Sequence, residues 1–231
     1  RSARGARGAG GDALVTRTLA QFAQDCGGQL QGRDRSYVGV STDSRSVARD
    51  ELFVALRGPR FDGNTFVAAA HAAGAAAAVV DAPAATPGAA EFPLIVVSDA
   101  LVALQRAATA RRARFGRPLV GVAGSNGKTT VKEMITRILS QAGATLATRG
   151  NFNNHIGVPL TLLRLEASDR FAVIELGADR PGEVAQLAGY ARPDVGIVTN
   201  AGAEHLEGFG DLPGVARAEG TCVVPLEKQR R

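Results

Sequence analysis

The stretch Leu119-Val-Gly-Val-Ala-Gly-Ser-Asn-Gly-Lys-Thr-Thr130 joins an apolar run to a glycine-containing turn and a lysine. The apolar run at residues 119–123 predicts a buried strand, and residues from Lys128 to about Ala142 predict a helix that Gly143 ends. Between a strand and a helix, glycines let backbone N–H groups approach phosphate oxygens, and the helix N-terminus adds partial positive charge. The stretch therefore predicts a phosphate-binding loop in a parallel α/β sheet.

Each polar group of this loop has a candidate role. Lys128 would neutralise the charge of the β- and γ-phosphates, and the Thr129 hydroxyl would bind Mg²⁺. The loop departs from the usual spacing, because Val122 stands five residues before Gly127, where that spacing requires glycine. The alternative is a glycine-rich turn before a helix with a surface lysine. The candidate ATP-binding residues are Gly124, Ser125, Asn126, Gly127, Lys128, Thr129 and Thr130.

The rest of the second half alternates apolar strands with helices. Residues 171–176 and 195–199 predict buried strands, and residues 146–147 predict a short one. Pro181 predicts the start of a helix that ends near Tyr190. This alternation is typical of a parallel sheet with helices on both faces.

The first half predicts a smaller α/β unit. Strands are expected at residues 37–40, 52–56, 77–80 and 94–97. Helices are expected after the capping residues Thr18, Asn64 and Ser98, with ends near Gly27, His71 and Arg114.

These patterns divide the chain into units. Residues 1–12, rich in Gly, Ala and Arg, predict a disordered leader. We expect an N-terminal domain at 13–114, a linker at 114–118 and a central domain at 115–231, with a tail from about residue 221 that departs from the preceding pattern.

Composition narrows the class of protein. The chain has 231 residues, 45% of them apolar, so it can bury a core without disulfides. Its two cysteines, Cys26 and Cys222, match no metal-binding spacing and fit a reducing compartment, so we expect a cytoplasmic protein. No run of about 18 apolar residues occurs, so we expect no membrane span.

The net charge of +5 arises at the chain ends. Without six terminal basic residues, 21 basic side chains remain against 22 acidic ones. A nucleic-acid-binding surface needs basic residues clustered on a folded face, so we expect no nucleic-acid partner. The alternative, an RNA- or DNA-binding protein, predicts a steep salt dependence of binding. The six residues are Arg1, Arg4, Arg7, Lys228, Arg230 and Arg231.

Several segments of the second half resemble the Mur ligase family. The loop GSNGKTT at 124–130 resembles the shortened ATP-binding loop of that family. GNFNNHIGVPLTLL at 150–163 resembles the segment after the helix that follows this loop. ELGA at 175–178 resembles a metal-binding strand end, and TNAGAEHLEGFG at 199–210 resembles the histidine segment of the family.

The first half resembles the uridine-nucleotide domain of the same family. The similar segments are STDSR at 41–45, LFVALRG at 52–58 and FDG at 61–63. The resemblance covers about residues 14–220. It implies a small N-terminal α/β uridine-nucleotide domain, followed by an incomplete P-loop-type ATP-binding domain with a parallel sheet.

The resemblance implies an ATP-dependent ligase of peptidoglycan precursor synthesis. The most similar member joins D-alanyl-D-alanine (D-Ala-D-Ala) to UDP-MurNAc-tripeptide through an acyl phosphate, which activates the carboxylate for attack by the amine. The implied cofactors are ATP and Mg²⁺, the implied partners are these small molecules, and we expect a monomer. The alternatives are the neighbouring member that adds the third residue of the peptide and a non-catalytic nucleotide-binding remnant.

The resemblance also implies roles for individual residues. Glu175 and His205 would bind Mg²⁺ together with Thr129, and Lys128, Glu175 and His205 would be catalytic. The alternative for Glu175 is a carboxylate that only reaches solvent at a strand end, and the alternative for His205 is a structural histidine. Amides of an asparagine cluster would hold substrate, or else bond their own backbone. Ser44 and Arg45 would contact the uridine diphosphate, because an Arg fork suits phosphate oxygens. The cluster residues are Asn151, Asn153 and Asn154.

Three departures from the family pattern stand out. Glu219 occupies the place where the family has a modified lysine that bridges metals. The family also continues for about as long again, with a C-terminal ligase domain that this sequence does not show, so we expect a truncated form and leave the activity of this chain alone open. Asn64 stands where the family usually has histidine, and we expect it to cap a helix.

Overall fold

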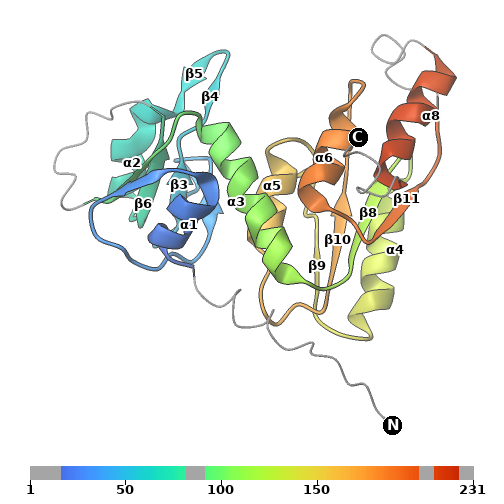
Figure 1. Ribbon diagram of the computed structural model, residues 1–231, viewed down its shortest axis with the longest axis horizontal. Helices are drawn as coiled ribbons and strands as arrows, with labels where there is room; N and C mark the ends of the chain where they lie inside the picture. Colours follow the sequence, from blue (N-terminus) through green and yellow to red (C-terminus); the bar gives the residue numbers. More distant parts are fainter. Residues whose placement is uncertain (1–16, 82–91, 203–210, 224–231) are drawn as a thin grey trace.

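The computed structural model describes residues 17–81, 92–202 and 211–223. Two lobes, each built on its own sheet, are joined by the long helix α3 (Ala100–Phe115) (Figure 1). The expected leader at 1–12, His205 and most of the expected tail lie outside the described residues. The mixed α/β class with parallel strands is confirmed.

The first lobe contains a five-stranded sheet of order β1-β7-β6-β3-β2. Its strands are parallel except β1, which pairs antiparallel with β7. A separate antiparallel hairpin, β4–β5, follows β3. The sequence patterns did not predict β1, β4 or β5. The strands are β1 (Gln29–Gln31), β2 (Val40–Ser41), β3 (Leu52–Val54), β4 (Arg57–Gly58), β5 (Phe61–Asp62), β6 (Ala77–Val80) and β7 (Leu94–Val96).

Capping side chains fix the helices of this lobe. In α1 (Leu19–Cys26) the Thr18 hydroxyl accepts from the N–H of Gln21, and Gly27 ends the helix with a φ of 75°, as predicted. The expected cap at Ser98 is wrong, because the Asp99 carboxylate accepts the N–H of Val102 at the start of α3.

The expected cap at Asn64 is also wrong. Asp62 caps the 3₁₀ helix η2 (Gly63–Phe66), accepting the N–H of Asn64, and α2 (Val67–Ala72) follows. The strand expected at 37–40 starts only at Val40. The N–H groups of Tyr37 and Val38 bond separate carbonyls of Arg17 and Asp50 instead of one partner strand.

The second lobe contains a four-stranded parallel sheet of order β11-β8-β10-β9. The helix α4 contacts β8, β9 and β10 (Figure 1). The helices α5 and α6 contact each other, and they contact the sheet at β10 and β8, respectively. The helix expected from Pro181 starts two residues later, after Gly182. The elements are β8 (Leu119–Ala123), α4 (Lys128–Ser140), β9 (Thr145–Ala147), α5 (Gly157–Leu163), β10 (Phe171–Glu175), α6 (Glu183–Ala191), β11 (Val195–Val198), α8 (Leu212–Gly220) and η3 (Thr221–Val223).

The helix α3 packs against elements of both lobes and carries two buried arginines. Arg111 Nε donates to the carbonyl of Leu165 at 3.0 Å. Arg112 Nε donates to the carbonyl of Ala191 at 2.7 Å, and its Nη2 pairs with Asp194 at 2.9 Å. The two carbonyls lie after α5 and at the end of α6, and the arginines satisfy both of them. The helix α3 therefore connects these second-lobe segments to the first lobe.

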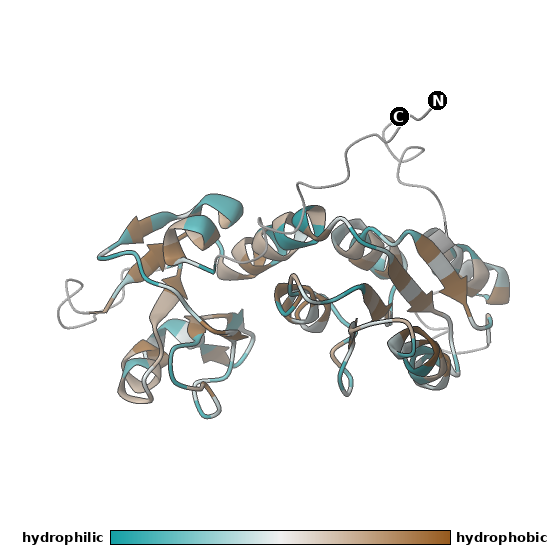
Figure 2. Ribbon diagram, turned by 90° about the horizontal axis from the view of Figure 1, so that it is seen from below, coloured by the Kyte–Doolittle hydropathy of each residue, from teal (hydrophilic) through white to brown (hydrophobic). Residues whose placement is uncertain are grey.

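The apolar core is continuous between the lobes. One cluster of buried residues includes Phe22 of α1, Leu104 and Phe115 of α3, and Ile174 of β10. Figure 2 shows hydrophobic colouring on strands of both lobes. Within the described part of the chain, no helix combines the length and the apolar character that a bilayer crossing requires.

Candidate nucleotide-binding site

The loop after β8 has a backbone that requires glycine. Gly124 has a φ of 121° and Gly127 a φ of 80°, both in the region that side chains disfavour. A Cβ on Gly124 would collide with the side chain of Thr199. Gly127 forms the N-cap of α4, so the loop amides lie at the start of that helix.

The chain after β11 holds this loop in place. The N–H of Ser125 donates to the carbonyl of Asn200 at 3.1 Å, and the N–H of Asn126 donates to Oδ1 of Asn200 at 3.0 Å. The Thr199 hydroxyl donates to the carbonyl of Asn126 at 2.6 Å. The loop is therefore fixed before any ligand binds.

Lys128 lies over the loop that precedes it. Its Nζ donates to the carbonyls of Gly124 at 2.5 Å and Ser125 at 2.8 Å. The ammonium group therefore lies where phosphates cradled by the loop amides would be neutralised. The surface-lysine alternative does not describe this geometry, because the side chain bonds the loop and lines a cavity beside it.

Glu175 ends β10 directly beside the start of α4. Its Oε2 accepts from the Thr129 hydroxyl at 2.9 Å, and its Oε1 accepts from Asn153 Nδ2 at 3.0 Å. The residue is only 3% exposed, so it does not reach solvent as the alternative expected. Both donors are neutral, so the carboxylate charge has no cation among these hydrogen-bond partners.

Two residues that we did not predict from the sequence, Thr148 and Lys132, hold the backbone at Glu175. The N–H of Glu175 donates to the Thr148 hydroxyl at 3.0 Å. Lys132, one turn after Lys128 and 2% exposed, donates to the carbonyl of Thr148 at 2.9 Å. The spacing of Lys132 from Lys128 could have indicated a side chain on the same helix face.

Glu219 of α8 also reaches the loop. Its Oε2 accepts the N–H of Gly124 at 2.7 Å, and the residue is 4% exposed. Glu219, which we expected at the place of the family's modified lysine, therefore contacts the backbone of the glycine-containing loop directly.

A cavity of about 290 Å³ lies beside the loop and brings several predicted residues together. It includes Lys128 and all three cluster asparagines, but not Ser44 or Arg45. It is lined by Ser125, Lys128, Asn151, Asn153, Asn154, His155, Gly177, Ala178, Asp179, Glu183, Val215 and Glu219.

The asparagines of the cluster differ in their bonding. Asn154 Oδ1 accepts the N–H groups of Ile156 and Gly157, which is the polar-turn alternative. Asn153 instead bonds Glu175, and its carbonyl accepts the N–H of Gly177 at 2.8 Å. Asn153 therefore links the cluster to the carboxylate.

Ser44 and Arg45 lie in the other lobe, in the turn after β2. Arg45 donates to both oxygens of Asp43, at 2.9 and 2.7 Å. This Arg45 fork and the Arg45 N–H lower the pKa of Asp43 to about 2. Asp43 thus occupies the Nε and Nη2 donors of Arg45, and a paired contact of these two donors with a diphosphate would require the release of Asp43.

The residues present fit a nucleotide with Mg²⁺. The Thr129 hydroxyl and the Glu175 carboxylate are hard oxygen donors 2.9 Å apart, beside positive-φ glycines and a lysine. In the described ranges no group of three His, Cys, Asp or Glu side chains is close enough to hold a metal alone. A phosphate oxygen would therefore complete the coordination, which is usual for Mg²⁺.

The fold and the loop define a two-lobed α/β protein with a candidate phosphate-binding loop on its second sheet. Two family models match, the Mur ligase family catalytic domain at residues 36–112 and the Mur ligase middle domain at residues 122–229. The chain belongs to the Mur ligase family. The second match extends past residue 221, where we expected the pattern to end.

Several similar proteins carry the same ligase name. A UDP-N-acetylmuramoyl-tripeptide--D-alanyl-D-alanine ligase from Escherichia coli is 45% identical over 90% of this chain and 45% of its own length. A crystal structure of MurF from Acinetobacter baumannii has a TM-score of 0.84 at 36% identity, over 92% of this chain and 47% of that one.

A crystal structure of MurF ligase from Thermotoga maritima in complex with ADP has a TM-score of 0.68 at 31% identity. It covers 80% of this chain and 42% of that chain. The chain thus spans about half the length of the relatives that it matches.

Proposed function

We propose that this chain forms the uridine-nucleotide and ATP-binding parts of a ligase that joins D-Ala-D-Ala to UDP-MurNAc-tripeptide. The observation that carries the proposal is the Thr129–Glu175 hydrogen bond beneath the phosphate loop. Similar proteins with this name and fold support the choice of substrates.

In this proposal the second lobe binds ATP. The amides of the loop and Lys128 hold the phosphates, and Thr129 and Glu175 hold Mg²⁺. When bound, Mg²⁺ supplies charge neutralisation at the transferred phosphoryl group. Asn153 orients the Glu175 carboxylate, so its oxygens face the loop before ligands arrive.

Preorganisation explains why these residues suit phosphoryl transfer. Such a reaction needs alignment and charge stabilisation more than covalent participation by the protein. The loop is already fixed by Thr199 and Asn200, so little reorganisation is needed during the reaction. Transfer of the γ-phosphoryl group of ATP to the carboxylate of the tripeptide would leave ADP and give an acyl phosphate. The amine of D-Ala-D-Ala would then attack its carbonyl carbon and displace inorganic phosphate. His205, a proposed metal ligand and catalytic residue, lies outside the described residues.

The first lobe would hold the uridine nucleotide. Ser44 and Arg45 follow the carboxyl end of the parallel strand β2, where α/β sheets commonly bind ligands. Arg45 would exchange Asp43 for the diphosphate. We propose a monomer that acts in the cytoplasm, and two buried free cysteines support a reducing compartment.

A phosphate-release assay with two substrate pairs tests the function. We expect release from ATP to require both UDP-MurNAc-tripeptide and D-Ala-D-Ala, and no release with UDP-MurNAc-dipeptide and a diamino acid. The opposite preference would support the neighbouring family member. ATP binding without release under either condition would contradict catalysis by this chain and support nucleotide binding alone.

A further inference from the structure

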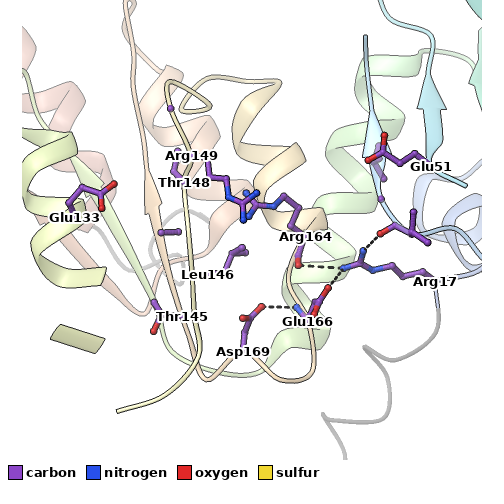
Figure 3. A pocket seen from close by; sticks show the side chains of 15 residues that line it. Arg17, Glu51, Glu133, Thr145, Leu146, Thr148, Arg149, Arg164, Glu166 and Asp169 are labelled. Atoms are coloured by element: carbon purple, nitrogen blue, oxygen red, sulfur yellow. Dashed lines mark hydrogen bonds and ion pairs between the residues drawn. The ribbon is translucent and has the colours of Figure 1, made fainter. Parts of the chain in front are cut away.

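The segment at residues 148–154 contributes to the walls of two cavities. Its first three residues line a cavity of about 850 Å³ between the lobes, together with Glu133 of α4 (Figure 3). Its three asparagines line the cavity beside the loop at 124–130, and the two cavities share no lining residue. The hydrogen bonds at Thr148, where the segment begins, therefore control how the chain passes from one cavity to the other.

The hydrogen-bond ladder between β9 and β10 changes at Thr148. The N–H of Thr148 donates to the carbonyl of Val173 at 3.1 Å, which continues the parallel pairing of Ala147 with Val173. In a regular parallel ladder of this register, the next bond would join the N–H of Glu175 to the carbonyl of Thr148. The N–H of Glu175 instead donates to the Thr148 hydroxyl at 3.0 Å. The two strands therefore part at the level of Glu175.

Lys132 binds the carbonyl that the ladder would have used. Its Nζ donates to the Thr148 carbonyl at 2.9 Å and pairs with Glu133 at 2.9 Å. Lys132 and Thr148 are each 2% exposed, and a buried ammonium group requires such partners. A charged donor also makes a stronger hydrogen bond to a carbonyl than a peptide N–H does. Lys132 therefore directs the Thr148 carbonyl toward α4 and away from β10.

The residues after Thr148 fold over the end of β10. The carbonyl of Asn153 accepts the N–H of Gly177 at 2.8 Å, and its Nδ2 donates to Oε1 of Glu175 at 3.0 Å. Glu175 is thus held at its backbone by Thr148 and at its carboxylate by Asn153. Its other oxygen, Oε2, accepts from the Thr129 hydroxyl.

We propose that Lys132 and Thr148 are positioning residues for Glu175 in the binding of Mg²⁺ with ATP. Lys132 draws the Thr148 carbonyl away from β10, and the Thr148 hydroxyl holds the backbone of Glu175 where its carboxylate faces Thr129. Neither residue lines the cavity beside the loop, so both act through Glu175. The inference rests on the proposed function, because it concerns the affinity for the metal that Glu175 would bind.

Calorimetry with a non-hydrolysable ATP analogue, with and without Mg²⁺, tests the role of Thr148. We expect Thr148→Val to lower the affinity with Mg²⁺ about tenfold, as for groups that orient a metal ligand, and to leave the affinity without Mg²⁺ unchanged. Thr148→Ser keeps the hydroxyl, so its affinity should stay within about twofold of the unaltered chain.

Thr161→Val is the matched control for Thr148→Val. Thr161 is also 2% exposed, and its hydroxyl also bonds the backbone, at the carbonyl of Gly157. Its loss should lower stability in urea and leave the magnesium dependence unchanged. Equal magnesium dependence in the two valine variants would reduce Thr148 to a structural role and overturn the inference.

A double-mutant cycle tests the effect of Lys132 on the Thr148 carbonyl. Lys132→Met frees this carbonyl for the N–H of Glu175, and we expect a loss of affinity with Mg²⁺ of about tenfold. Because the N–H then no longer uses the hydroxyl, adding Thr148→Val should cost little more. Independent roles would instead multiply to a loss of about a hundredfold, which would contradict the inference. If Lys132→Met does not fold, the two valine variants still decide the role of Thr148.

Amide hydrogen exchange of the chain without ligands separates this inference from the proposed function. In Thr148→Val the N–H of Glu175 should exchange at least about tenfold faster, and adding Lys132→Met should restore its protection. Unchanged exchange in Thr148→Val would overturn the positioning role alone. Equal affinity for the ATP analogue with and without Mg²⁺ in the unaltered chain would contradict the proposed function, and this inference with it.

Discussion

The Thr129 hydroxyl donates a 2.9 Å hydrogen bond to Oε2 of Glu175, from a position 46 residues earlier in the chain. This bond joins the first turn of α4 to the carboxyl end of β10. Parallel strands bring their carboxyl ends to one edge of a sheet, and the strand order places β10 beside β8. The two oxygen donors of the proposed metal site are therefore a direct product of the topology.

We expect Glu175→Gln to remove the magnesium dependence of ATP binding. The amide keeps the shape of the side chain but loses its charge, which Mg²⁺ requires. The affinity for ATP with Mg²⁺ should fall about tenfold or more, as for the loss of a charged interaction. Calorimetry with and without Mg²⁺ measures this difference.

Glu133→Gln is the matched control, since it removes an exposed carboxylate from α4 outside the loop cavity. It should leave the magnesium dependence unchanged. Equal magnesium dependence in Glu175→Gln and the unaltered chain would remove Glu175 from the metal site.

Lys128→Ala should abolish the thermal stabilisation of the chain by ATP. Lys128 Nζ lies at the loop carbonyls, where it would neutralise phosphate charge. At 100 times the dissociation constant, a ligand stabilises a protein by about 2.7 kcal/mol, and the variant should lack this gain. Scanning calorimetry measures it.

Binding of a uridine nucleotide to the first lobe serves as the control for Lys128→Ala. We expect it to be unaffected, because Ser44 and Arg45 lie in the other lobe. Full ATP stabilisation of the variant would show that the nucleotide binds elsewhere.

Arg112→Ala should destabilise the fold by about 2–4 kcal/mol. The side chain is 7% exposed and bonds the carbonyls of Ala191 and Arg192 as well as Asp194. Its removal leaves these acceptors without their donor. Urea unfolding measures the change, and Arg33→Ala, at an exposed arginine, should change stability by less than about 0.5 kcal/mol. Equal stability of the two variants would contradict the role of α3 between the lobes.

The stability of the fold should fall as the pH rises from about 9 to 11. Burial raises the pKa of the Cys222 thiol from 9.0 to about 11, so the unfolded chain releases this proton first. The unfolded state then binds fewer protons than the folded state, and the free energy of unfolding decreases with pH. Urea unfolding at several pH values in this range measures the slope for the chain and for Cys222→Ala. Identical slopes would contradict the prediction.

Strong local patterns predicted a large part of the fold. Thr18 begins α1 through its own hydroxyl, and Gly27 ends it through its own backbone conformation. The apolar strands β8, β10 and β11 lie within one residue of the predicted ranges. The turn between β8 and α4 was predicted in the same way, since its glycines and lysine are contiguous, and its role in phosphate binding stays a prediction. Family membership and the α/β class are confirmed.

Features that depend on tertiary contacts could not be predicted. The short strands β1, β4 and β5 contain at most three residues, too few for a periodic pattern. The cap of α3 is Asp99 and not Ser98 because the helix starts one residue later than expected. The contact between Glu219 and Gly124 joins positions 95 residues apart, which no local spacing indicates.

The proposed site is also only partly described by local sequence. The pairing of Arg45 with Asp43 depends on side-chain conformations two residues apart. The pairing of Asn153 with Glu175 requires the loop after β9 to fold over the end of β10. Patterns along the chain identified these residues as candidates, but the sheet topology determines which of them meet.

A crystal structure of the chain with a non-hydrolysable ATP analogue and Mg²⁺ tests the central claim most directly. We predict that the phosphates bind the amides of residues 124–130 and that the metal lies about 2.1 Å from Thr129 Oγ1, on the side that faces Glu175. A nucleotide bound away from this loop, or a metal that contacts neither residue, would contradict the account.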